Sequence, residues 1–103
     1  MNRFVRDIEN FLLENWGKKP LTDLQREANI DLYSLLTIAY KMGLHKISTP
    51  TIRRRWTADE DKFLEDNAST LTTSEASNLL YRSRYATYQR IKYLQLEQMI
   101  NRK

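Results

Sequence analysis

The sequence predicts an all-α protein made of two tandem three-helix units joined by a short basic linker. Only 2 Gly and 2 Pro occur in 103 residues, so few positions break helices or form the turns between strands. Apolar residues instead recur three and four positions apart, which is the spacing of amphipathic helices. The pattern of residues 4–44 returns 52 residues later, at residues 56–96, which favours an internal repeat.

The first unit is predicted over residues 1–46 and is the more apolar of the two. Its first helix is expected from Phe4 to Trp16, because apolar residues line one side of this stretch. Two shorter helices follow it. The signals that bound these helices are Gly17 after the first helix, Thr22 and Gln25 as a capping box for the second, Asp31 as the cap of the third, and Gly43 after its end.

A linker is predicted over residues 47–55, a second unit over residues 56–97 and a tail over residues 98–103. The linker has no helical period, contains Pro50 and ends in three arginines. The helix signals of the second unit are Thr57 with Glu60 as one capping box, Thr72 with Glu75 as another, and Ser83 as the cap of the third helix.

Shifting the chain by 52 residues aligns the two units without a gap. The identical pairs, six in 41 aligned positions, are Asp7/Asp59, Phe11/Phe63, Leu12/Leu64, Asn15/Asn67, Tyr33/Tyr85 and Leu44/Leu96. Capping positions also agree, as in Asp31 and Ser83. A true duplication is favoured, although two unrelated triplets of amphipathic helices would also align to this extent.

The second unit resembles a Myb/SANT-type domain. Residues 55–61 read RWTADED and precede Phe63 and Leu64, and Arg82-Ser83 opens the third helix. This pattern is similar to the Myb-like units of prokaryotic and phage proteins, over about 41 residues; Ile91 stands where animal Myb repeats usually carry an aromatic residue. The resemblance implies a helix-turn-helix arrangement whose third helix lies in the major groove of DNA, braced by the first two.

The third helix of the second unit has a polar, cationic side that suits DNA independently of the resemblance. With Thr87 and Ile91 inward, its other side carries groups that read bases or hold phosphates. The candidate DNA-binding residues, including the arginines before the unit, are Arg53, Arg54, Arg55, Arg82, Arg84, Tyr85, Tyr88, Gln89, Arg90 and Lys92. The alternative is a solvated helix face, which usually carries more Glu; none occurs between Glu75 and Glu97.

Two charged clusters and one single arginine leave alternatives open. Arg53–Arg55 either follows a phosphate strand as a flexible arm or only solubilises the linker. Arg90 either reaches phosphate or pairs with an acidic residue of the first helix of the second unit. Asp59–Asp61 is explained by the preference of carboxylates for the first turn of a helix better than by a metal site. Residues 51–103 carry 10 basic and 7 acidic groups, a net +3, against 7 and 6, a net +1, in residues 1–50.

The third helix of the first unit is mainly apolar where that of the second is cationic. Such a surface binds phosphate poorly and buries itself well against protein, whether the other unit, a second copy or a different protein. The candidate protein-interaction residues are Leu32, Leu36, Ile38 and Tyr40, at the positions of Arg84, Tyr88, Arg90 and Lys92. We expect a division of labour between the two third helices.

The leading functional prediction is a small protein that binds double-stranded DNA, as a transcriptional regulator or recruitment factor of phage or mobile-element type. The alternative is a protein-interaction module that docks on and modulates a host or partner protein. The sequence has no Cys, a single His and no Gly-rich phosphate loop, so we expect no metal, no cofactor and no enzymatic activity. It has no signal peptide or apolar span, and we expect a cytoplasmic, nucleoid-associated protein.

Overall fold

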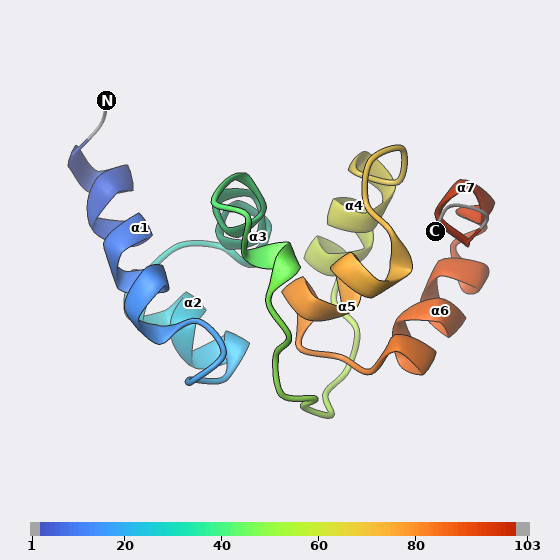
Figure 1. Ribbon diagram of the computed structural model, residues 1–103, viewed down its shortest axis with the longest axis horizontal. Helices are drawn as coiled ribbons and strands as arrows, with labels where there is room; N and C mark the ends of the chain where they lie inside the picture. The colour runs from blue at the N-terminus through green and yellow to red at the C-terminus, as the bar shows by residue number, and fades with distance from the viewer. Residues whose placement is uncertain (1–2, 101–103) are drawn as a thin grey trace.

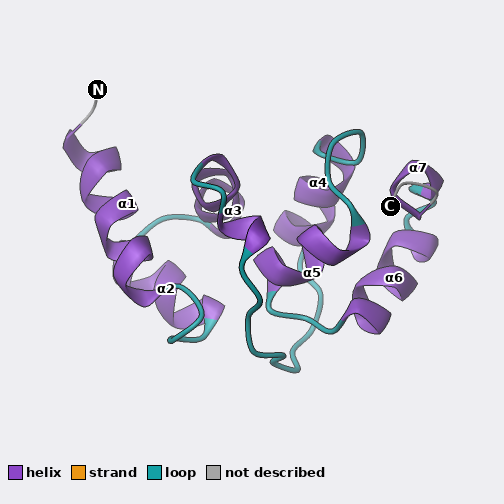
Figure 2. Cartoon of the chain, in the orientation of Figure 1, coloured by secondary structure: helices purple, strands orange, loops and turns teal. Residues whose placement is uncertain are grey.

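The computed structural model describes residues 3–100, with side chains from residue 6 onward, and every regular element in this range is helical (Figures 1 and 2). The all-α prediction is confirmed for this part of the chain. The elements are α1 (Arg3–Asn15), α2 (Leu21–Ala28), α3 (Leu32–Lys41), the 3-10 helix η1 (Leu44–Lys46), α4 (Ala58–Asp66), α5 (Thr73–Leu80), α6 (Arg84–Tyr93) and α7 (Glu97–Ile100).

Side-chain caps begin four of these helices where the sequence predicts them. Asp31 accepts a hydrogen bond from the Ser34 N–H at the start of α3, and Ser83 accepts one from the Ala86 N–H at the start of α6. Reciprocal capping boxes start the other two helices; they are Thr57 with Glu60 for α4 and Thr72 with Glu75 for α5. Each such cap typically contributes about 1 kcal/mol to stability.

The capping box predicted from Thr22 and Gln25 is wrong. α2 begins one residue before Thr22, and Pro20 occupies the N-cap position with no side-chain cap bond. Proline suits the start of a helix because its fixed φ, here −58°, is compatible with helical geometry and it lacks an N–H that would need a partner. The first turn is held by burial of Leu21, which is 1% exposed.

Local backbone geometry recurs with a step of 52 residues. The bounds of α5 and α6 follow those of α2 and α3 by that number. Left-handed residues end the corresponding helices: Asn29 and Tyr81 have φ of 57° and 55°. Gly43 and Gln95 have φ of 82° and 62°. Each of these two turns is therefore made twice, and three of the four residues, all except Gly43, have a side chain that must tolerate positive φ.

One hydrophobic cluster runs through the molecule. Figure 1 shows α3 beside α4 in the middle, with α1 and α2 toward one end and α6 and α7 toward the other. Leu12, Leu35, Phe63 and Leu79 are all fully buried in this cluster. The radius of gyration is 13.1 Å, which is about the value of a single domain of this length. The N-terminal half (residues 3–46) and the C-terminal half (residues 58–100) are thus packed together.

The contact between the halves is made by α3 lying on α4. The Tyr33 hydroxyl donates to Asp66 at 2.5 Å, and the Tyr33 backbone N–H points to Asp59 at 3.4 Å. The rings of Tyr33 and Tyr40 both meet the Phe63 ring edge to face, at centroid distances of 6.1 and 6.2 Å. This combination of buried ring and hydrogen-bonded rim fixes the position of α3.

The sequence predicts that residues 98–100 belong to a tail, but in the structure they are part of the helix α7 (Glu97–Ile100). α6 ends at Tyr93, the left-handed Gln95 turns the chain, and α7 folds back on α6. Met99 in α7 is completely buried, so this turn of helix belongs to the fold. The rest of the predicted tail, residues 101–103, lies outside the described residues.

Tyr81 is a second link between the halves. It follows α5 in the left-handed conformation, its ring meets Trp16 edge to face at 5.3 Å, and its hydroxyl accepts the Gly17 N–H at 2.5 Å. Burial raises the pKa of the Tyr81 phenol, which therefore stays uncharged at neutral pH. The burial of the Tyr81 ring and its hydrogen bond to a backbone donor offset the free-energy cost of its unfavourable φ.

We predict that Tyr81→Phe lowers the free energy of unfolding by about 1 kcal/mol, because the Gly17 N–H loses its acceptor while the ring remains. Urea unfolding followed by circular dichroism measures this difference. Tyr85→Phe is the matched control, since Tyr85 is 72% exposed, and it should leave stability unchanged. Equal stability of Tyr81→Phe and the wild type would show that the hydrogen bond contributes nothing.

Candidate nucleic-acid interface

The segment between η1 and α4, residues 47–57, is a strap bonded along its length to the end of α5. The Thr49 hydroxyl donates to the Asn78 carbonyl at 2.7 Å, and the Ile52 N–H donates to the Tyr81 carbonyl at 2.9 Å. The Arg54 guanidinium donates to the Leu80 carbonyl at 3.0 Å. The flexible arm that was one interpretation of this segment is therefore wrong.

A buried carboxylate anchors the strap to both α4 and α6. Glu60 is completely buried and pairs with Arg54 at 2.8 Å and with Arg82 at 3.0 Å. It also accepts the N–H and hydroxyl of Thr57, at 3.0 and 3.1 Å. A buried charge is costly unless it is fully paired, and here two cations and two neutral donors satisfy it.

Arg82 is the centre of this network. Besides Glu60, its guanidinium donates to the Arg54 and Arg55 carbonyls at 2.8 and 3.0 Å, and it lies 3.8 Å above the Trp56 ring. It is only 7% exposed. These contacts join the strap, the start of α4 and the residues before α6.

Three arginines that the sequence analysis predicts to bind DNA instead form ion pairs within the protein. Arg54 and Arg82 pair with Glu60, and Arg90 forms a two-pronged ion pair with Asp61 at 2.7 and 2.9 Å. Hydrogen bonding to Asp61 raises the pKa of Arg90. The cause in each case is a carboxylate of α4, and for Arg82 and Arg90 that carboxylate lies 22 and 29 residues away in the sequence.

The other predicted residues of α6 lie on its outer side. Arg84, Gln89 and Lys92 are exposed, and Tyr85 is 72% exposed. Tyr88 is half-buried, and its ring lies under the ammonium of Lys92 at 5.5 Å. The inward side is as expected, because Thr87 and Ile91 are completely buried and Leu94 is partly so.

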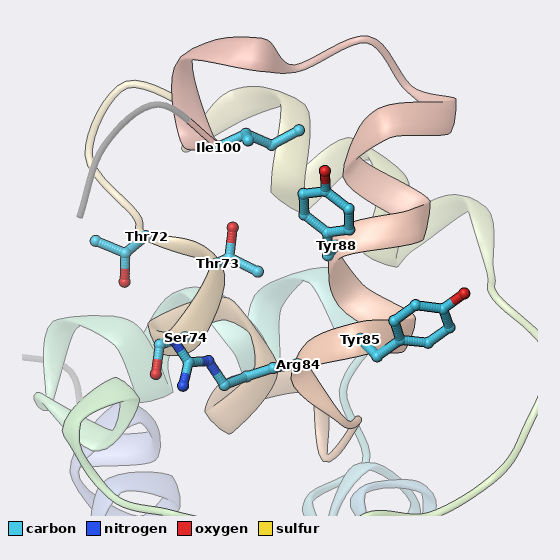
Figure 3. Close-up of a pocket in the computed structure, with 7 residues that line it drawn as sticks. All are labelled: Thr72, Thr73, Ser74, Arg84, Tyr85, Tyr88 and Ile100. Carbon is cyan, nitrogen blue, oxygen red and sulfur yellow. The ribbon is translucent and has the colours of Figure 1, made fainter.

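Tyr85 stands where three shallow hollows meet. The largest, about 620 Å³, separates α6 from the start of α5 and from α7. In Figure 3, Arg84 reaches across it beside Ser74, Tyr88 points toward Ile100, and Tyr85 points away to the other side. The other two hollows next to Tyr85 measure about 470 and 400 Å³, and Arg53 and Tyr93 are among their lining residues.

Four cations of this region form no ion pair within the described part of the chain. They are Arg53, Arg55, Arg84 and Lys92, and all four are exposed. Glu60 and Asp61 of α4 are already paired with arginines, and Glu75 of α5 is paired with Lys46 at 3.0 Å. The outer side of α6 and the adjoining strap therefore present uncompensated positive charge.

The predicted protein-interaction residues of α3 are used inside the chain. Leu32 and Leu36 are buried, at 6% and 0% exposure, and are not open to an external partner. Ile38 and Tyr40 are partly buried against the core, and the Tyr40 hydroxyl donates to Thr70 at 2.8 Å. Of the three possible partners of this surface, the structure places the other half of the same chain against it.

Sequence reasoning missed several residues of the candidate interface. Tyr93 is 72% exposed and lies in the same i, i+4 row of α6 as Tyr85 and Gln89, so its spacing from Gln89 was a usable signal. Thr73 and Ser74 flank α6 only because α5 packs beside it, and no local pattern indicates that.

Comparison with known proteins gives no family or relative. No family model, no curated protein and no solved structure matches the chain. Within the described residues, no group of acidic, His or Cys side chains is arranged to hold a metal ion. None of the described helices has the length and apolar character needed to cross a membrane.

We predict that Arg82→Ala lowers the free energy of unfolding by about 3 kcal/mol, because it removes one partner of a buried ion pair. Arg84→Ala is the matched control two residues away, and as an exposed change it should stay within about 0.5 kcal/mol of the wild type. Urea unfolding of both variants provides the comparison. Equal effects would contradict the assignment of Arg82 to the core.

Proposed function

We propose that this chain is a small DNA-binding protein made of two tandem three-helix units of helix-turn-helix type, with α6 as the helix that enters the major groove. The observation that carries the proposal is the outer side of α6, where exposed Arg84, Tyr85, Gln89 and Lys92 lie together without a carboxylate. The recurrence of helix bounds and left-handed turns at a 52-residue step supports the two-unit description.

The chemistry of this side suits base edges. Arginine donates two hydrogen bonds to O6 and N7 of guanine, and glutamine pairs with N6 and N7 of adenine. Arg84 lies in the first turn of α6 and Gln89 in its middle, so both project from the part of a recognition helix that contacts bases. Tyr85 and Lys92 extend the same surface with groups that bind phosphate oxygens.

The strap supplies a second set of cations at a fixed position. Arg54 is turned inward to Glu60, whereas Arg53 and Arg55 are exposed on either side of it. Arg53 lines the same hollow as Tyr85, so it adjoins the α6 surface. In this arrangement the strap arginines contact the phosphate backbone while α6 reads the groove.

We predict that Arg84→Ala weakens binding to a preferred duplex by about 1–3 kcal/mol, because the guanidinium contacts a base. Preferred duplexes are first selected from a random pool, and affinity is then measured by fluorescence anisotropy. Arg26→Ala, an exposed arginine in α2, is the matched control and should bind like the wild type. Equal losses on every duplex would assign Arg84 to the backbone, and no binding even at low salt would refute the proposed function.

We predict that replacing both Arg53 and Arg55 by alanine makes binding less salt dependent. Each phosphate contact contributes about 0.9 to the slope of log affinity against log salt, so two lost contacts lower its magnitude by about 2. Titrations at several salt concentrations measure the slope. An unchanged slope would remove the strap from the interface.

A further inference from the structure

The contact between α3 and α4 has two matching halves elsewhere in the molecule, one on α6 and the other on α1. Within the chain, Tyr33 of α3 rests on Asp59, Phe63 and Asp66 of α4. A step of 52 residues carries Tyr33 to Tyr85 of α6. The same step carries the three α4 residues to Asp7, Phe11 and Glu14 of α1.

The residues of this contact are preserved to an unusual degree. Three of the six identical pairs between the halves belong to it: Tyr33/Tyr85, Asp59/Asp7 and Phe63/Phe11. Asp66 is matched by Glu14, which keeps the carboxylate that receives the tyrosine hydroxyl. We call the tyrosine of this contact the knob, and the two carboxylates and the phenylalanine that receive it the seat. Both the knob and the seat are thus present twice in the sequence.

Tyr85 and the α1 residues are more open than their counterparts within the chain, although the Lys19 ammonium lies 5.8 Å from the centre of the Phe11 ring. Phe63 is completely buried beneath α3, whereas Phe11 on α1 is only partly buried. Asp7 and Glu14 are exposed, and a hollow of about 280 Å³ adjoins Asp7 and Phe11. On α6, Tyr85 is 72% exposed, whereas Tyr33 is partly buried.

We propose that copies of this chain associate head to tail, with Tyr85 of α6 in one molecule seated on Asp7, Phe11 and Glu14 of α1 in the next. In this contact the Tyr85 hydroxyl donates to Glu14, its ring meets Phe11 edge to face, and its backbone N–H faces Asp7.

Charge favours the same pairing. The seat on α1 is acidic through Asp7 and Glu14, and the knob lies between the unpaired cations Arg84 and Lys92. Opposite charges across an interface speed encounter and fix its register. Lys92 stands where α3 has Tyr40, so one aromatic contact is absent and the association is weaker than the packing inside the chain.

This arrangement is heterologous, because two different surfaces meet, and it builds chains or rings rather than closed symmetric dimers. It also uses the side of α6 that the proposed function assigns to DNA. Duplex DNA and self-association therefore compete for α6, and the two are measured separately.

The test combines two variants in one mixing experiment. Asp7→Lys breaks the seat and Tyr85→Ala removes the knob. Light scattering should therefore give the mass of a monomer for each variant alone, at concentrations where the average molar mass of the wild type rises through assembly. Each retains the surface that the other lacks, so an equimolar mixture should form a complex of two chains. Glu65→Lys, an equal charge change on the exposed side of α4, is the control and should assemble like the wild type.

Circular dichroism and urea unfolding check that both variants are folded. A wild type that remains monomeric into the millimolar range, a single variant that still assembles, or a mixture that stays monomeric would overturn the inference. Asp7→Lys should bind duplex DNA as the wild type does. DNA binding without assembly would refute the inference alone, and assembly without DNA binding would refute the proposed function alone.

Discussion

The buried carboxylate of Glu60 is the interaction on which the arrangement of the C-terminal half depends. It begins α4 through its bond to Thr57, and it holds Arg54 of the strap and Arg82 before α6. The strap, the start of α4 and Arg82, which lies 22 residues after Glu60, thereby meet at one charge. Removing any of them would leave a buried ion short of partners, and this penalty makes the geometry specific.

α3 and α6 differ in what surrounds them. α3 is covered because α4 follows it in space, and its aromatic residues Tyr33 and Tyr40 fill the contact. α6 ends the series and keeps its outer side open, apart from the turn of α7 that carries the buried Met99. α3 is therefore apolar where α4 covers it, and α6 is cationic where its outer side is open to solvent.

Local signals in the sequence were sufficient for most helix starts, because a cap such as Thr57 or Ser83 acts within one turn. They were insufficient for the arginines. Arg82 and Arg84 are two residues apart and chemically identical, yet one is buried and the other free. The difference is set by Glu60, 22 residues before Arg82, and only the packing of α4 beside α6 reveals it.

The strap has a thermodynamic consequence for any ligand that meets it. A loose arm loses conformational entropy when it settles on a surface, at a cost of roughly 1–2 kcal/mol for each residue whose backbone is fixed. Here Ile52 and Arg54 are already bonded to the end of α5, so this ordering has occurred during folding. Loosening those bonds would weaken attachment at Arg53 and Arg55 without deleting a single contacting group.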